Sequence, residues 1–388
     1  MKKLLNPSLI RTKAGTLGSS SRKTTSAAET AFPEIRRSLI RWYRQNGRDL
    51  PWRNTSDPYR IWVSEILLQQ TRVETVIPYY KTFLDRFPTV QSLAMASQDD
   101  VLKTWENLGY YSRARNLHRA ARIVQENLSG EIPRSRDALR KLPGVGAYTA
   151  GAIASIAFGE PVPAVDGNAR RVLARLFSVR TALNRPSTIR RLETIAGRLV
   201  LGSDPGAFNQ GLMDLAGAFC TPRKPACSRC PLQKHCRSLR QGLQETIPAK
   251  VEKKKTPDRQ AAAAFLRDRK NRLLVVRRPE KGLLCGLWKL PGGFLHEGEP
   301  LENGLVRTVE EEIGVTIDPR RLIGTVRHSY THFRLILRVF DARIVPRKPR
   351  PLLCGDLRWA DPDALRSLAF SRADRMALEL AGTPHSTF

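Results

Sequence analysis

The spacing of apolar residues changes once along this chain, and that change constrains what the chain can fold into. From Phe32 to about residue 240, apolar side chains recur at steps of three and four, the period of amphipathic helices. Further on the step drops toward two, as in 262–266 and 334–340, and one helical segment at 301–313 interrupts that pattern. We therefore predict a tail at 1–30, an all-α region at 31–240, a linker at 241–257 and an α+β domain at 258–388.

Local signals place several helices in the first region. Asp57 followed by Pro58 is typical of a helix start, with a capping carboxylate and proline at the first helical position. A second amphipathic helix should follow Thr71. Further helices are predicted around residues 101–108, 117–128, 150–158, 170–177 and 189–201.

The charge of the chain indicates a polyanionic partner. Lys and Arg number 66 against 36 Asp and Glu, a formal charge of +30, far more than solubility requires. No apolar run is long enough for a membrane span, so nucleic acid is the expected partner. The basic, acid-poor residues 1–30 should be disordered. They also suit an organellar transit peptide, but we favour a plain tail on a cytoplasmic, nucleoid-associated bacterial protein.

A glycine-rich turn joins two of the predicted helices at 142–146. Gly144 and Gly146 let the backbone around Val145 approach a large ligand, and the free N–H groups of the next helix would favour a phosphate. Asp166 is a predicted N-cap, which favours an ionised carboxylate. Many such turns only cap a helix. The pairing nevertheless resembles the helix-hairpin-helix DNA glycosylases, in which the hairpin grips a strand and the Asp faces the anomeric carbon.

Four cysteines, Cys220, Cys227, Cys230 and Cys236, lie close together and indicate one metal site in a reducing compartment. Zinc is one candidate, although structural zinc more often uses two separated Cys-x2-Cys pairs, and this sequence has one. The spacing is similar to the [4Fe–4S] loop of the endonuclease III and MutY glycosylases. That resemblance implies one [4Fe–4S] cluster within 220–236 with a structural, DNA-binding role.

Glu65 is the candidate proton donor. It shares a predicted helix face with Ile61 and Trp62, so its carboxyl is partly desolvated or at a pocket rim, although the spacing also fits an exposed glutamate. Burial would raise its pKa and make it a general acid near neutral pH. The run 58–71 closely resembles the MutY adenine glycosylases, and in that family the glutamate at this position protonates adenine.

The resemblance to the MutY family continues through 47–52, 108–115 and 208–210, and so covers nearly all of 32–248. It implies roles for further residues, although Tyr110 could equally be an ordinary core aromatic. The adenine pocket would be lined by Arg48, Leu50, Trp52 and Gln210. Gln70 and Tyr110 would wedge into the base stack, Thr71 would lie near the opposite base, and Tyr148 and Asn168 would support Asp166.

Tyr148 distinguishes members of the superfamily. Relatives that also cut the strand carry a lysine here, which forms a Schiff base with the sugar, and tyrosine cannot form an imine. The resemblance therefore implies a monofunctional glycosylase. Some thymine-mismatch glycosylases share this tyrosine, but the run around Glu65 and the C-terminal domain favour the MutY family.

The C-terminal domain carries a Nudix box, Gly293-x5-Glu299-x7-Arg307 through Val315, with one departure. Thr308 stands where Nudix hydrolases have a glutamate, while Glu311 and Glu312 remain at the metal-binding pair. MutY proteins end in a Nudix-like domain that recognises 8-oxoguanine without hydrolysing nucleotides. Tyr330, Thr331 and His332 align with the aromatic–hydroxyl–histidine motif that this family uses on the lesion.

The sequence thus predicts a helix-hairpin-helix glycosylase domain followed by an α+β Nudix-like domain. The resemblance implies a monomeric adenine DNA glycosylase that acts on double-stranded DNA with adenine opposite 8-oxoguanine or guanine, and leaves an abasic site. Two alternatives are a Nudix hydrolase with an added DNA-binding domain and a non-catalytic DNA-binding protein.

Overall fold

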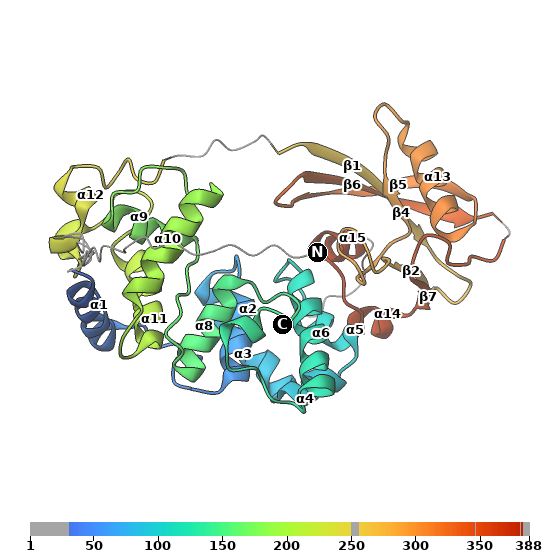
Figure 1. Cartoon of the computed structure of the whole chain (residues 1–388). Coiled ribbons are helices and arrows are strands. Elements are labelled where there is room, and N and C mark those ends of the chain that lie inside the picture. The colour runs from blue at the N-terminus through green and yellow to red at the C-terminus, as the bar shows by residue number, and fades with distance from the viewer. Residues whose placement is uncertain (1–30, 250–255, 346, 381, 383–388) are drawn as a thin grey trace, which may run out of the picture.

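The computed structural model describes residues 31–249, 256–345, 347–380 and 382, which form a helical half and a sheet-containing half (Figure 1). The predicted disordered tail at 1–30 and the segment 250–255 of the predicted linker lie outside the described residues. None of the helices in the described ranges has both the length and the apolar character needed to cross a membrane.

The helical half confirms the predicted all-α class. Two short 3₁₀ turns, η1 (Cys227–Arg229) and η2 (Gln233–His235), follow its last long helix. Its α-helices are α1 (Phe32–Asn46), α2 (Pro58–Leu68), α3 (Val73–Arg86), α4 (Val90–Met95), α5 (Gln98–Thr104), α6 (Ser112–Asn127), α7 (Arg136–Leu139), α8 (Ala147–Phe158), α9 (Gly167–Leu176), α10 (Pro186–Leu199), α11 (Pro205–Ala218) and α12 (Arg237–Arg240).

The predicted start of α2 is confirmed, because the Asp57 carboxylate accepts a 2.8 Å hydrogen bond from the Tyr59 N–H. The predicted end of the helix at 101–108 is wrong, since α5 ends at Thr104. The chain then turns through left-handed conformations at Asn107 (φ 73°) and Tyr110 (φ 47°), which an α-helix cannot contain. The segment 105–111 is therefore a loop, and it carries Tyr110.

Two hydrophobic cores divide the helical half into two lobes. The first core is built mainly from residues between Leu50 and Ala154. The second combines α1 with residues from Val165 to Ile247, so the start of the helical half packs against its end. The elements α1 and α9–α12 accordingly group on one side and α2–α6 on the other (Figure 1). The boundary between the lobes brings α2 close to the start of α9, which positions the site described below.

The C-terminal half has two sheets, in the orders β4-β1-β6-β5 and β3-β2-β7. Strands β1 and β6 are parallel, and the other pairs are antiparallel. Its elements are β1 (Asp258–Leu266), β2 (Leu273–Arg277), β3 (Trp288–Lys289), β4 (Gly292–Phe294), α13 (Leu301–Ile313), β5 (Ile317–Ser329), β6 (Arg334–Ile344), β7 (Asp356–Ala360), α14 (Pro362–Ser367) and α15 (Arg372–Glu379).

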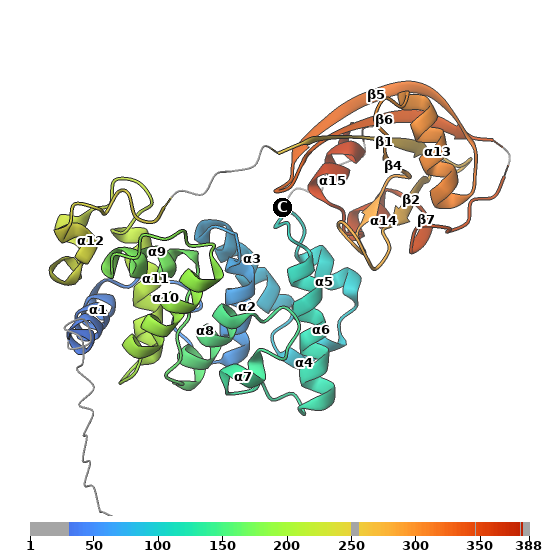
Figure 2. The ribbon, with the colours of Figure 1, turned by 45° about the horizontal axis from the view of Figure 1, so that its top comes forward.

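Alternation along β1 buries both faces of the larger sheet. Ala263 and Phe265 pack into a core shared with α14 and α15. Ala264 and Leu266 point the other way, into a core shared with α13. Figure 2 shows α13 and α15 on either side of these strands. The α+β class is confirmed, although the sequence pattern did not indicate β5, because this edge strand exposes most of its side chains and contains two register shifts.

Candidate active site

A cavity of about 190 Å³ lies where the two lobes of the helical half meet. Its lining draws on the segment before α2, on α2 itself, on α8 and α11, and on the start of α9. The predicted site residues that line it are Arg48, Leu50, Trp52, Glu65, Thr71, Tyr148, Asp166, Asn168 and Gln210. The fold thus collects in one cavity side chains that are far apart in the sequence.

Glu65 is buried at the inner wall of this cavity. The residue is 5% exposed, and its Oε2 atom has no hydrogen-bond partner among the described residues. Burial raises the pKa of the Glu65 carboxyl to about 7, with a further contribution from the charge of Asp166, while the Tyr148 hydroxyl and the Arg53 guanidinium oppose the shift. Near neutral pH this carboxyl can therefore hold a proton and donate it.

Asp166 faces the cavity in a different environment. It is the N-cap of α9, and its carboxylate accepts hydrogen bonds from the Ala169 N–H at 2.6 Å and from Asn168 Nδ2 at 3.1 Å. Hydrogen bonds of this kind and the positive end of the helix dipole stabilise negative charge. One cavity therefore holds a desolvated carboxyl and a carboxylate stabilised by donors, the arrangement that separates an acid from an anion.

Tyr148 on α8 lines the same cavity and interacts with both carboxyl groups. Burial raises the pKa of its phenol well above the usual value, and the charges of Glu65 and Asp166 raise it further. The phenol therefore stays protonated and keeps an O–H that it can donate to a neighbour. Its hydroxyl also lies 3.5 Å from the sulfur of Met213 on α11.

Sequence analysis did not identify Arg53 and Asp214, which also organise the cavity. The buried Asp214 carboxylate forms an ion pair with Arg53 through both guanidinium nitrogens, and it accepts a 2.9 Å bond from Arg48 Nε. Burial opposes ionisation of Asp214, but these two arginines hold its pKa below the usual value. Asp214 lies one helical turn after Gln210, a residue already predicted to line the pocket. That spacing could have indicated that Asp214 is near the pocket, although it does not point to the partner Arg53.

The predicted cluster ligands lie together on the far side of α9. Cys220, Cys227, Cys230 and Cys236 line one small cavity of about 30 Å³, with apolar walls from α9 and α11. No group of three or more His, Cys, Asp or Glu side chains in the described part of the chain is arranged to hold a single metal ion. Four thiols around one apolar cavity nevertheless form a donor set that fits an iron–sulfur cluster.

Arginines on α9 connect the two sites, and sequence analysis did not identify them either. Arg171 donates to the Asn168 side chain at 2.9 Å and to the Cys220 carbonyl at 2.7 Å. One turn later, Arg175 donates to the Thr221 carbonyl at 2.6 Å and approaches the Cys220 sulfur at 3.4 Å. The cysteine segment is therefore held directly against the helix that Asp166 caps.

The predicted DNA hairpin is left-handed at Gly144, as its glycines led us to expect, but not at Gly146, which is extended at φ −81°. Gly144 is left-handed, with φ 77°, and a side chain there would meet Asn116 at 2.7 Å. Val145 turns back on Leu142 through a 3.2 Å backbone hydrogen bond. Gly146 is the N-cap residue of α8 and provides no side-chain cap. No atom of the described residues beyond its chain neighbours lies within 4 Å of the position that its Cβ would occupy. This open helix start suits an anion such as a DNA phosphate.

A second cavity, of about 440 Å³, lies between the helical half and the C-terminal half. It is lined by Tyr110 from the loop 105–111 and by Tyr330, Thr331 and His332. The hydroxyls of Tyr110 and Thr331 lie 2.5 Å apart, so they form a hydrogen bond across the two halves. Tyr110 is 39% exposed and is therefore not a core aromatic.

Gln70 lies outside both cavities, exposed and left-handed at φ 58° just after α2. Arg113, whose role sequence analysis did not identify, ties this turn to the Tyr110 loop. Its guanidinium donates to the Gln69 carbonyl at 2.6 Å and to the Gly109 carbonyl at 3.3 Å. The two residues predicted to wedge into the base stack are thus held by one buried arginine.

Comparisons with known proteins identify families for both halves. Residues 63–196 match the family of HhH-GPD superfamily base excision DNA repair proteins, and residues 262–380 match the NUDIX domain. Residues 220–236, which contain the four cysteines, match the iron-sulfur binding domain of endonuclease III.

Similar curated and solved proteins agree with these families. The adenine DNA glycosylase of Homo sapiens is 35% identical over 402 residues, which cover 89% of this chain and 73% of the human protein. That of Buchnera aphidicola subsp. Schizaphis graminum is 32% identical, covering 76% of this chain and 84% of the relative. The structure of a thermostable thymine-DNA glycosylase is 33% identical with a TM-score of 0.50, covering 54% of this chain and 99% of that one.

The raised pKa of Glu65 predicts a pH-dependent cost to stability. The pKa is about 7 in the folded chain, against 4.5 for an unperturbed glutamate, so between these values the folded protein holds a proton that the unfolded chain has lost. Stability should therefore fall as pH rises from about 4.5 to 7. Glu65→Gln removes the titrating group and should raise the free energy of unfolding at pH 8 by roughly 3 kcal/mol, but by under about 1 kcal/mol at pH 5.

Urea unfolding at the two pH values checks this prediction. Glu126→Gln, at an exposed position on α6, is the control, and we expect it to change stability little at either pH. A gain for Glu65→Gln that is equal at pH 5 and pH 8 would contradict the assignment of a raised pKa.

Proposed function

Because the chain belongs to the adenine DNA glycosylases of base excision repair, we propose that it excises adenine standing opposite 8-oxoguanine or guanine in double-stranded DNA. The reaction is hydrolysis of the N-glycosidic bond, which releases adenine and leaves an abasic site. The observation that carries the proposal is the pairing, in one cavity, of a buried Glu65 with a pKa of about 7 and a capped Asp166.

Adenine must leave the duplex before this cavity can act on it, which costs a few kcal/mol of unstacking. The flipped base would be enclosed by Leu50, Trp52 and Gln210, with Arg48 held in place by Asp214. Glu65 then protonates the base at N7, which turns adenine into a better leaving group. A pKa of about 7 suits this step, because the carboxyl is protonated in a large share of molecules near neutral pH.

Asp166 acts on the sugar. Loss of the base leaves positive charge on the anomeric carbon, and a carboxylate facing that carbon stabilises it or captures it transiently, as carboxylates do in glycosidases. The hydrogen bond from Asn168 orients the carboxylate, and the protonated Tyr148 interacts with both carboxyl groups. Water then completes hydrolysis. We propose that the enzyme is monofunctional, since Tyr148 cannot form an imine with the sugar.

We propose that the four cysteines hold a [4Fe–4S] cluster. When bound, the cluster would cross-link residues 220–236 and so present basic side chains to the DNA backbone. The cavity shared by the four thiols and the contacts of Arg171 and Arg175 with this segment support that role. An iron content near four per chain would agree with it, and zinc at full activity would exclude it.

We propose that the cavity between the two halves recognises the opposite base. Adenine itself is identical in normal and mispaired duplex, so discrimination depends on its partner. Tyr330 supplies an aromatic surface, and Thr331 and His332 supply hydrogen-bonding groups. Both cavities are complete within one chain, so we expect one chain per mismatch, which sedimentation of the complex checks.

Removing either carboxyl group should stop the chemistry without preventing binding. Glu65→Gln lacks the proton donor and Asp166→Asn lacks the anion, and each should slow adenine release by about 10²–10⁴-fold. Single-turnover assays on duplex with adenine opposite 8-oxoguanine measure the rates, and titration of the same duplex measures affinity. Asp49→Asn, an exposed carboxylate just before this cavity, should keep the normal rate. Normal rates in either active-site variant would refute the assignment.

The tyrosine at position 148 predicts that borohydride traps no more than a trace of covalent enzyme–DNA adduct. Tyr148→Lys places an amine beside the sugar and should gain a detectable adduct and some strand scission. Tyr148→Phe, which also lacks an amine, is the matched control and should form none. A strong adduct with the unmodified protein would overturn the monofunctional proposal.

Loss of the lesion contacts should reduce discrimination between opposite bases. A well-placed hydrogen bond to a base edge contributes about 1–3 kcal/mol, so Thr331→Ala with His332→Ala should reduce the preference for 8-oxoguanine over guanine by about 10²-fold. Adenine excision rates and affinities opposite each base give the ratio. Thr325→Ala, exposed on β5, should leave the ratio unchanged. A double variant that discriminates like the parent would exclude this cavity as the recognition site.

A further inference from the structure

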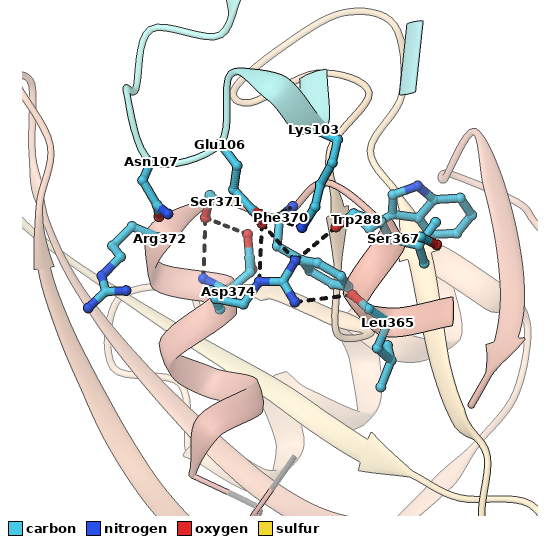
Figure 3. A network of polar contacts seen from close by, with 12 residues as sticks. Lys103, Glu106, Asn107, Trp288, Leu365, Ser367, Phe370, Ser371, Arg372 and Asp374 are labelled. Carbon is cyan, nitrogen blue, oxygen red and sulfur yellow. Dashed lines mark hydrogen bonds and ion pairs between the residues drawn. The ribbon is translucent and has the colours of Figure 1, made fainter. Parts of the chain in front are cut away.

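Glu106 joins the two halves of the molecule through a buried carboxylate. It lies in the loop 105–111 of the helical half, and its side chain is 2% exposed. Oε1 accepts bonds from Arg375 at 2.7 and 3.1 Å and from the Phe370 N–H at 3.2 Å, all from the C-terminal half (Figure 3). Oε2 accepts a 2.6 Å bond from Lys103 on its own side. The donors to Glu106 in the described part of the chain thus come from both the helical half and the C-terminal half.

Arg375 is fixed within the C-terminal half before it reaches Glu106. Its guanidinium donates to the Leu365 carbonyl at 3.1 Å and to the Leu368 carbonyl at 2.8 Å. It also lies over the Phe370 ring, 4.6 Å from the centroid. A guanidinium held on three sides presents its remaining donors in one direction only, so the contact with Glu106 defines an orientation between the halves.

The Glu106 side of this contact belongs to the loop that carries Tyr110. The loop is held in an unfavourable backbone conformation, with Asn107 and Tyr110 both left-handed. Tyr111, at its end, donates from its hydroxyl to the Phe370 carbonyl at 3.1 Å. The backbone N–H of Phe370 therefore bonds to Glu106 and its carbonyl to Tyr111, so both ends of the loop are attached to the same residue.

Phe370, on the other side of this contact, is adjacent to residues that hold Tyr330, one of the residues that we propose for recognition of the opposite base. Ser371 follows Phe370, and its hydroxyl donates to Asp374 at 2.6 Å, while Asp374 also pairs with Arg278 at 2.9 Å. Tyr330 packs against this group: burial raises the pKa of its phenol, and Ser371 and Arg278 act against that shift. A displacement of Phe370 and Ser371 would therefore displace Tyr330 relative to Tyr110.

We propose that Glu106 and Arg375 are positioning residues. They fix the position of the Tyr110 loop relative to Tyr330, so that recognition of the opposite base controls excision of adenine. The inference rests on the proposed function of the cavity between the halves. Adhesion of the two halves does not require this ion pair, because Leu287 and Ala369 of the C-terminal half are buried in the helical half's own core. Buried ion pairs add little net stability compared with apolar contacts, whereas they can specify one arrangement.

Three variants of the full chain separate positioning from stability: Glu106→Gln, Arg375→Met and the double variant. Glu106→Gln leaves Arg375 and Lys103 without their counter-charge, and Arg375→Met leaves Glu106 without its strongest donor, so both should lower the melting temperature. Each should also reduce the ratio of adenine excision rates opposite 8-oxoguanine and opposite guanine by about tenfold, the effect of losing one base contact. The rate opposite guanine should stay within about twofold.

The double variant is the decisive one. It removes both members of the ion pair, so its melting temperature should rise above those of the single variants. Recovery should be partial, because Lys103 and the Leu365 and Leu368 carbonyls still lack their partners. The ratio of rates should remain low, because the relative position of the two halves is no longer specified. Arg366→Met is the matched control, since its exposed partner Asp363 lies in the same short helix and the pair does not cross between the halves. It should leave the ratio unchanged.

Two outcomes would overturn the inference. One is a double variant, or two stable single variants, with the parent's ratio of rates. The other is a double variant in which ratio and melting temperature recover together, as expected of a purely structural pair. If the unmodified protein itself shows no preference for 8-oxoguanine, the proposed function fails first, and this inference fails with it.

Discussion

The active site depends on keeping one carboxyl group, that of Glu65, buried and without a counter-ion. A buried carboxyl usually acquires a cationic partner, which would lower its pKa and leave it unable to donate a proton. Arg53 is close enough to act on Glu65, but its guanidinium is engaged in a two-point contact with Asp214. Because Arg53 is bonded to Asp214, it does not form an ion pair with Glu65. Asp214 lies on α11, the helix through which the second lobe contributes to the cavity.

The same division into lobes shows how the cysteine segment is connected to the active site. Asp166 can cap α9 only if that helix is firmly placed, and α9 contributes to the second core through Val172 and Leu173. Arg171 and Arg175 then attach the cysteine segment to the same helix through hydrogen bonds to the Cys220 and Thr221 carbonyls. Packing and hydrogen bonds therefore connect the cysteines to the carboxylate through one rigid element, without requiring any direct contact.

Features that are local in the sequence were predictable. The cap at Asp57, the helix of Glu65, the turn at Gly144 and the Nudix box each depend on residues within a few positions of one another. The contacts that sequence analysis missed join distant segments: Arg53 with Asp214, and Tyr110 with Thr331. No local pattern encodes such pairs. Residues 105–108 were misassigned to a helix for a related reason. Glu106 and Tyr111, on either side of the left-handed Asn107 and Tyr110, are attached to the C-terminal half, and these contacts overrule the apparent helical period.

The acidic residues of the Nudix box are engaged in contacts within the domain. Glu312 is buried, pairs with Lys289 at 2.7 Å and accepts a 3.1 Å bond from the Gly292 N–H. Glu299 pairs with Arg307, also at 2.7 Å. These lysine and arginine side chains supply the positive charge that the carboxylates need, so the box can hold α13 against β3 and β4 through contacts of its own. Thr308 fits this role, since its buried hydroxyl bonds within α13 to the Leu305 carbonyl and adds no charge. The acidic residues of the box are thereby part of the packing of this domain, which leaves the recognition that we propose to Tyr330, Thr331 and His332 in the cavity between the halves.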